Sequence, residues 1–209
     1  MTGFDQQLLI NAKLGIEQTC LELLNLGADA NVQDDNGLTP LLFACEQNRL
    51  KLSTQLIARG AQVNWPGNDM RTPLHLAAYN GYFELTGLLL RSGALVDYRD
   101  TKGSTPLHSA GCGDDTRITE LLLAHGAQID ANNMFGDTPL RLSMRYGRTK
   151  ASLYLLDRGA NYLKIRTVLN TEQYQKANPQ CALALLSWAT RHSAMMTIKE
   201  GLTPLKTRP

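Results

Sequence analysis

The pair Thr-Pro recurs in this chain with a fixed step of 33 residues, and that step constrains the fold more than any other feature. The four copies are Thr39-Pro40, Thr72-Pro73, Thr105-Pro106 and Thr138-Pro139. A Gly-Ala pair keeps the same step, at Gly27-Ala28, Gly60-Ala61, Gly93-Ala94, Gly126-Ala127 and Gly159-Ala160. Two independent markers in one register predict a protein of stacked repeats, in which each unit contacts only its neighbours. Such an array favours binding over catalysis.

One repeat, residues 67–99, predicts a pair of helices joined by a turn. Thr72 can cap the first helix, and Pro73 suits its first position because no backbone N–H is needed there. Gly81 and Gly93 follow the two helices as residues that tolerate a left-handed backbone. The second helix carries leucine pairs that recur every 33 residues, which is the pattern of a buried face.

The repeats resemble the ankyrin repeat family. Its Thr-Pro-Leu-His signature stands at Thr72–His75 and at Thr105–His108, with weaker copies at 39–44 and 138–143. The resemblance implies an all-α solenoid of stacked helix-turn-helix units with connecting β-turn or hairpin loops. We expect a single domain over residues 1–192 and a C-terminal tail over 193–209. Within the domain we expect an N-terminal capping unit (1–33), four repeats (34–66, 67–99, 100–132 and 133–165) and a C-terminal capping unit (166–192).

Hydrophobicity, cysteine content and charge indicate where in the cell the chain is located. Its 209 residues contain no apolar run long enough to span a membrane, and the N-terminus lacks a secretory pattern. The four cysteines form no C-x-x-C pair. We expect buried thiols and a cytoplasmic or nuclear location. Residues 1–138 hold 9 basic and 16 acidic side chains, whereas residues 139–209 hold 12 and 3.

The residues that could suggest a catalytic or metal site all have a structural explanation. His75 and His108 occupy the signature position at which ankyrin repeats use imidazole to bridge loops of neighbouring units. Asp114 and Asp115 precede an expected helix over 116–125, whose N-terminus favours negative charge. No nucleotide-binding or hydrolase motif occurs, and no histidines show metal-ligand spacing. We expect no enzymatic activity, no cofactor and no metal.

Partners of ankyrin repeats usually contact the loop tips and the concave side of the first helices. Five of the 13 aromatic residues map there by register, and Tyr, Trp and Arg dominate interface energetics. The expected partner-binding residues are Leu38, Trp65, Asn68, Arg71, Tyr79, Asn80, Tyr98, Arg99, Lys102, Phe135, Arg145 and Tyr146. In the alternative, Trp65 and Phe135 fold inward and shield a neighbouring turn.

The basic C-terminal end leaves two interpretations open. Its side chains form either a patch for an acidic protein, phospholipid or nucleic acid, or a solvated face of the capping helices. The residues concerned are Arg141, Arg145, Arg148, Lys150 and Arg158. Nucleic acid is the least favoured ligand, because no recognisable binding motif accompanies the basic residues.

The leading hypothesis is a monomeric, non-catalytic protein–protein interaction module that acts as an adaptor, scaffold or inhibitor. A secreted bacterial effector that mimics host ankyrin repeats is one variant of it. The alternative role is that of a substrate. The chain resembles known substrates of an asparaginyl hydroxylase, which modifies a hairpin asparagine eight residues after a leucine. Asn31 and Asn64 match that spacing.

Overall fold

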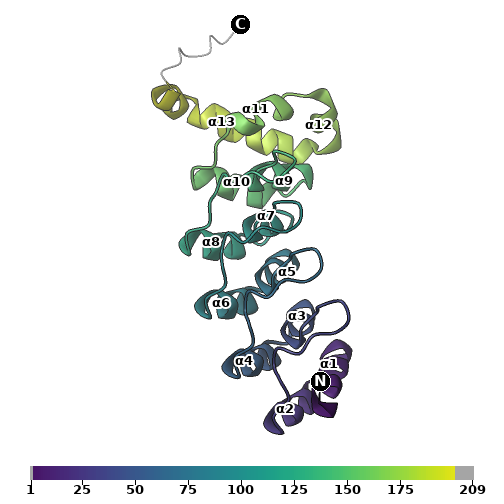
Figure 1. Cartoon of the computed structure of the whole chain (residues 1–209). Helices are drawn as coiled ribbons and strands as arrows, with labels where there is room; N and C mark the ends of the chain where they lie inside the picture. Colours follow the sequence, from purple (N-terminus) through teal and green to yellow (C-terminus); the bar gives the residue numbers. More distant parts are fainter. Residues whose placement is uncertain (1, 201–209) are drawn as a thin grey trace, which may run out of the picture.

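A computed structural model of the chain describes residues 2–200, and it describes the side chains of residues 2–192. In that part of the chain all regular structure is helical, with thirteen helices and no strand. The helices form an elongated stack with the first helix at one end and the last three helices at the other (Figure 1). This confirms the all-α repeat solenoid that the 33-residue step predicts. None of the described helices combines the length and the apolar character that a bilayer crossing demands.

Each repeat contributes one inner and one outer helix, which stand in two columns (Figure 1). The hairpin loops that join successive repeats project from the inner column. The inner helices are α1 (Gly3–Leu14), α3 (Pro40–Glu46), α5 (Pro73–Asn80), α7 (Pro106–Gly111) and α9 (Pro139–Arg145). The outer helices are α2 (Glu17–Asn25), α4 (Leu50–Ala58), α6 (Phe83–Arg91), α8 (Thr116–Ala124) and α10 (Thr149–Asp157).

The recurring Thr-Pro pairs begin the inner helices as expected. The Thr39 hydroxyl accepts from the backbone N–H of Leu42 at 3.4 Å, and the Thr138 hydroxyl accepts from that of Arg141 at 3.2 Å. Each proline occupies a first-turn position. Helix α5 ends at Gly81, whose φ of 80° is the left-handed backbone that glycine adopts at little cost.

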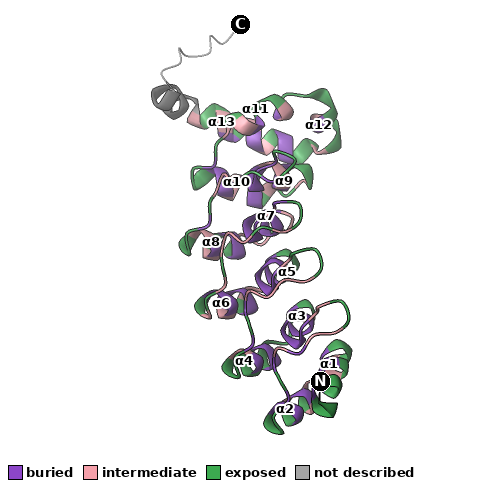
Figure 2. Ribbon diagram, viewed as in Figure 1, coloured by how far each residue is buried: buried purple, intermediate pink, exposed green. Residues whose placement is uncertain are grey.

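The core lies between the two columns of helices (Figure 2). Leucines at equivalent register positions are fully buried there, among them Leu56, Leu89, Leu122 and Leu155. Burial of apolar area contributes roughly 25 cal/mol per Å². Packing between repeats is therefore the main source of stability, since a single helix pair leaves its faces uncovered.

Small residues set how closely neighbouring inner helices approach. Cys45, Ala78, Gly111 and Met144 share one register position. A Cβ atom added to Gly111 would lie 2.9 Å from the carbonyl oxygen of Pro139, so α7 and α9 meet there almost backbone to backbone. Met144 holds the same position beside the C-terminal cap, and α9 packs there less intimately against the next inner helix.

The C-terminal cap contains three helices, α11 (Leu163–Leu169), α12 (Glu172–Ala177) and α13 (Pro179–Glu200). Thr171 keeps the repeat register without the proline, because its hydroxyl accepts from the backbone N–H of Tyr174 at 3.3 Å. Helix α13 covers α10 and α12 and continues to Glu200, past the expected domain boundary at residue 192. The rest of the expected tail, residues 201–209, lies outside the described residues.

Of the two adjacent acids, only Asp115 acts as expected. It is the N-cap of α8 and accepts from the backbone N–H of Arg117 at 3.0 Å. The expectation for Asp114 was wrong, since its carboxylate accepts from the backbone N–H of Ala151 at 3.2 Å, in the next repeat. Asp114 therefore joins two repeats, a role that depends on how the units stack rather than on local sequence.

Candidate protein-binding site

The inner surface of the stack is hollowed between the hairpin loops and helices α5, α7 and α9. The cavity there has a volume of about 440 Å³, and we call it the central cavity. Six of the twelve residues expected to bind a partner line it: Arg71, Tyr79, Lys102, Phe135, Arg145 and Tyr146. They come from three successive repeats, so the stacking itself brings them together.

Three aromatic side chains of the central cavity are exposed to solvent. Tyr79 is 52% exposed, Tyr146 55% and Phe135 68%. The guanidinium carbon of Arg71 lies 5.1 Å from the centre of the Tyr79 ring, a cation–π contact that orders both side chains. Exposed aromatic groups of this kind bury large areas at a low cost in conformational entropy when a partner covers them.

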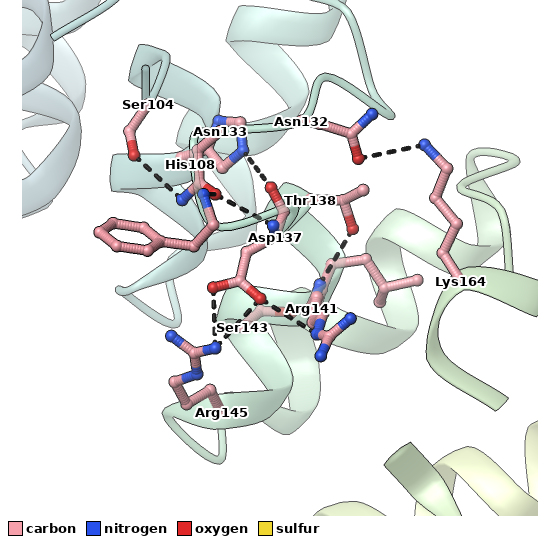
Figure 3. A network of polar contacts seen from close by, with 12 residues as sticks. Ser104, His108, Asn132, Asn133, Asp137, Thr138, Arg141, Ser143, Arg145 and Lys164 are labelled. Atoms are coloured by element: carbon pink, nitrogen blue, oxygen red, sulfur yellow. Dashed lines mark hydrogen bonds and ion pairs between the residues drawn. The ribbon is translucent and has the colours of Figure 1, made fainter. Parts of the chain in front are cut away.

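A buried carboxylate holds two arginines at one end of the central cavity (Figure 3). The Asp137 side chain is 1% exposed, and Arg141 Nε lies 3.0 Å from its Oδ1 in an ion pair. A terminal nitrogen of Arg145 lies 3.0 Å from Oδ1 and 2.8 Å from Oδ2, and the latter contact is an ion pair rather than an aligned hydrogen bond. The two guanidinium groups are thus fixed in position while 39% and 56% of their side chains stay exposed.

Three of the residues expected to bind a partner make contacts within the stack. The indole Nε1 of Trp65 donates to the carbonyl oxygen of Gly37 at 3.1 Å, which agrees with the inward alternative for this residue. Tyr98 packs its ring edge-on against His75, with 6.4 Å between the ring centres. Arg99 donates to the carbonyl oxygens of Gly103 and Asn132 and so joins two loops. None of the three lines the central cavity.

The remaining expected contacts also lie outside the central cavity. Leu38 is half-buried and packs against the core, whereas Asn68 and Asn80 are exposed. Phe135 does not fold inward, so the alternative that explains Trp65 does not apply to it. At the basic end, Arg148 donates to the carbonyl oxygen of Cys112 at 2.7 Å, and Arg158 pairs with Glu120 at 3.4 Å. Both of these arginines join neighbouring repeats.

The two hairpin asparagines bridge successive repeats through both ends of their amides. Asn31 donates to the carbonyl oxygen of Gly60 at 2.9 Å and accepts from the backbone N–H of Gln62 at 2.8 Å. Asn64 makes the same pair of bonds to Gly93 and Leu95, at 3.0 and 2.8 Å. These bonds give both asparagines a structural role in the repeat.

His75 and His108 bridge the repeats as the family resemblance implies. In each case Nδ1 accepts from the backbone N–H of the capping threonine, at 3.2 and 3.1 Å. The protonated Nε2 therefore donates to the carbonyl oxygen of Ser104 or Asp137, at 3.0 Å in both. Burial lowers the pKa of both imidazoles, which keeps them neutral and suits this bridging role.

Neither Cys45 nor Cys112 provides an activated nucleophile. Cys45 is fully buried, and burial raises its pKa to about 12, so the thiol stays protonated. Burial also raises the pKa of the half-buried Cys112, which borders the central cavity. Within residues 2–192, no three His, Cys, Asp or Glu side chains are grouped as a metal ion would require.

Register alone missed part of the cavity lining. Asp100, Ser109, Asn133 and Leu142 border the central cavity but were not among the expected contacts. Ser109 and Leu142 share a register position in the middle of the inner helix, one turn after its start. Its variation between Ser and Leu was a usable signal, because a position that varies between polar and apolar is not fixed by the core.

The stacked helix pairs, hairpin loops and histidine bridges together correspond to one known architecture. A family model described as ankyrin repeats (3 copies) matches residues 8–100 and 88–165. A comparison with curated proteins finds no match. Members of the matched family are typically non-catalytic and generally serve in protein–protein interaction. The chain belongs to the ankyrin repeat family.

Proposed function

We propose that this chain is a non-catalytic interaction module that binds a protein partner across the central cavity. The observation that carries the proposal is the gathering of Tyr79, Phe135 and Tyr146 around one hollow while half or more of each side chain is exposed. These aromatic rings stand on two repeats of a rigid stack, Tyr79 in 67–99 and both Phe135 and Tyr146 in 133–165. Binding therefore costs little ordering of the module, which favours affinity.

Arginines complete the site. Arg71 is held against Tyr79, and Arg145 is held by Asp137. Arginine and tyrosine are the residue types most often found where alanine substitution weakens an interface. The site thus offers aromatic surface and fixed donors to a protein segment that lies along the inner helices. A role as adaptor, scaffold or inhibitor, a monomeric state and a cytoplasmic or nuclear location are parts of the same proposal.

The test starts with proximity labelling in the source cell, which marks the proteins that lie beside the chain and so identifies its partner. The affinity of the purified partner is then measured for the parent chain and for Tyr79→Ala/Phe135→Ala. We expect the double variant to bind about 30-fold more weakly, which is about 2 kcal/mol. Phe4→Ala is the matched control, because Phe4 is 45% exposed but lies on the N-terminal unit.

The proposal fails if the double variant keeps its circular dichroism spectrum and binds the partner as tightly as the parent does. It also fails if Phe4→Ala weakens binding as much as the double variant, since the contact would then lie on the N-terminal unit. Loss of binding by the double variant alone assigns the contact to the central cavity.

A further inference from the structure

A second cavity, of about 300 Å³, lies between α9 and the C-terminal cap. We call it the cap cavity. It is lined by Arg141, Met144, Arg145, Val168, Thr171, Gln173, Tyr174, Ala177 and Asn178. Arg145 also lines the central cavity, so the two hollows adjoin across one side chain. A segment bound in the central cavity can therefore continue into the cap cavity.

Met144 lines the cap cavity at a register position where the preceding repeats carry smaller residues. In the preceding repeat Gly111 lets α7 and α9 approach so closely that an added Cβ would meet the carbonyl oxygen of Pro139 at 2.9 Å. Met144 fills the same register position and is itself buried, at 1% exposure. The hydroxyl of Tyr174, on α12, donates to the carbonyl oxygen of Met144, on α9, at 3.2 Å.

A second departure from the repeat pattern gives the cap cavity its charge. Arg141 stands at the position of His75 and His108, but it does not bridge to the next loop as they do. Its Nε turns to Asp137 instead (Figure 3). Asp137 thus serves two guanidinium groups with a single carboxylate, which leaves a surplus of one positive charge at the wall between the two cavities.

The rest of the lining specifies what the cap cavity can hold. Among the residues whose side chains the structure describes, the charged ones that line it are Arg141 and Arg145, and none of its lining residues is acidic. Met144, Val168 and Ala177 supply apolar surface, and Gln173 and Asn178 supply amides. A hollow with fixed guanidinium groups on one wall and aliphatic side chains on another matches a carboxylate next to an aliphatic group.

We propose that the cap cavity binds an acidic residue of the protein partner together with an adjacent aliphatic residue. The inference rests on the proposed function, because the same partner segment would pass from the central cavity over Arg145 into the cap cavity. The carboxylate accepts from the free N–H groups of Arg141 and Arg145, while the aliphatic side chain packs on Met144 and Val168. The cavity takes one or two side chains, which fits a peptide segment better than a flat membrane surface.

The test uses random peptides displayed on phage and selected on the full-length chain. We expect the retained peptides to carry Asp or Glu directly beside Leu, Ile, Val or Met. Synthetic copies should lose about tenfold in affinity when the acid is replaced by its amide, or when the bait is Arg145→Gln or Arg141→Gln. Each single variant leaves Asp137 one arginine partner, so neither strands a buried carboxylate. Lys150→Gln removes one exposed charge from the outer helix α10 and is the matched control.

The inference is overturned if the retained peptides lack acids, or if the parent, Arg145→Gln and Arg141→Gln baits bind them with equal affinity. If those same peptides still bind the Tyr79→Ala/Phe135→Ala variant more weakly than the parent chain, the proposed function stands. Only the binding of an acidic residue in the cap cavity is then contradicted. If selection on the parent chain enriches no peptides beyond what selection on the Arg145→Gln variant enriches, the cap cavity is not a peptide site. If Lys150→Gln lowers the affinity as much as Arg145→Gln does, the effect reflects the overall positive charge of this end of the chain and not a contact in the cap cavity.

Discussion

The Nε2 of His108 donates to the backbone carbonyl oxygen of Asp137 at 3.0 Å, and this bond ties the third repeat to the fourth. His75 makes the equivalent bond to Ser104 one repeat earlier. Because the backbone N–H of Thr105 occupies Nδ1 of His108, the ring must remain in one neutral tautomer to serve both neighbours. The cohesion of the central repeats is therefore linked to the protonation of two buried imidazoles.

Acidification should weaken the fold through His75 and His108. Burial holds their pKa below the ordinary value of 6.5 in the folded state, whereas the unfolded chain takes up protons near 6.5. The unfolded state therefore binds more protons below about pH 6.5, and the free energy of unfolding falls as the pH falls through that value. Urea titrations between about pH 5 and pH 7 measure this slope.

The variant His75→Gln/His108→Gln should show a shallower pH slope. Glutamine can still complete the capping box with Thr72 and Thr105, but it does not titrate. His125→Gln is the control, because His125 is exposed in the turn after α8. An unchanged slope in the double variant would assign the pH dependence to other groups.

Met70→Gly should stabilise the array. Met70 has a φ of 59° where Gly37, Gly103 and Gly136 have 74°, 70° and 71° at the equivalent position. A left-handed backbone costs an ordinary side chain about 1–2 kcal/mol, partly offset by the greater freedom of glycine in the unfolded chain. We expect a net gain of about 0.5 kcal/mol in the free energy of unfolding, measured by urea titration.

Asn48→Gly is the matched comparison for Met70→Gly. Asn48 also has a positive φ, of 56°, but asparagine tolerates that conformation. Its replacement should change the stability by less than that of Met70. If Met70→Gly lowers the stability, the contacts of the Met70 side chain outweigh its backbone strain.

Gly111→Ala should destabilise the stack by about 2 kcal/mol, a cost typical of overpacking. The added methyl group would lie 2.9 Å from a backbone oxygen, which cannot move without separating α7 and α9. Gly87→Ala on α6 is the control, because its methyl group would lie 3.1 Å from the flexible end of Arg91 and at an ordinary contact distance of 3.7 Å from Leu121 Cδ2. That change should be neutral or stabilising, since alanine favours helix. Equal thermal shifts for the two variants would contradict the close approach of α7 and α9.

Trp65→Phe should lower stability by about 1 kcal/mol and leave partner affinity unchanged. The substitution removes the hydrogen bond from Nε1 to the carbonyl oxygen of Gly37 but keeps an aromatic ring. Thermal unfolding and the affinity of the purified partner are the two measurements. If the variant binds the partner more weakly but is as stable as the parent, Trp65 is a partner-binding residue.

The repeat register predicted the helix pairs because each marker residue acts locally. Thr39 and Thr138 cap the helices that follow them, and Gly81 ends α5, without reference to the rest of the fold. The direction of a loop side chain does not follow from such signals. Trp65 and Phe135 both looked like contact residues, yet Trp65 reaches back to Gly37 while Phe135 faces solvent, because neighbouring loops decide each orientation.

The cavities depended on spacing that the sequence encodes only indirectly. Gly111 and Met144 share a register position, and a side chain at Gly111 would prevent the close approach of α7 and α9. The pairing of Arg141 and Arg145 with Asp137 needs the three-dimensional path of α9 and its hairpin. Composition showed the basic C-terminal end but not which of its arginines face a hollow.

The most direct test of the binding surface is site-specific photocrosslinking in the source cell. A benzophenone amino acid placed at Phe135 keeps an aromatic group in the central cavity, and one placed at Ala124 lies exposed on the outer helix α8. Binding across the central cavity predicts a protein adduct from position 135 and none from position 124. An adduct from position 124 alone, or an adduct of nucleic acid from position 135, would contradict it.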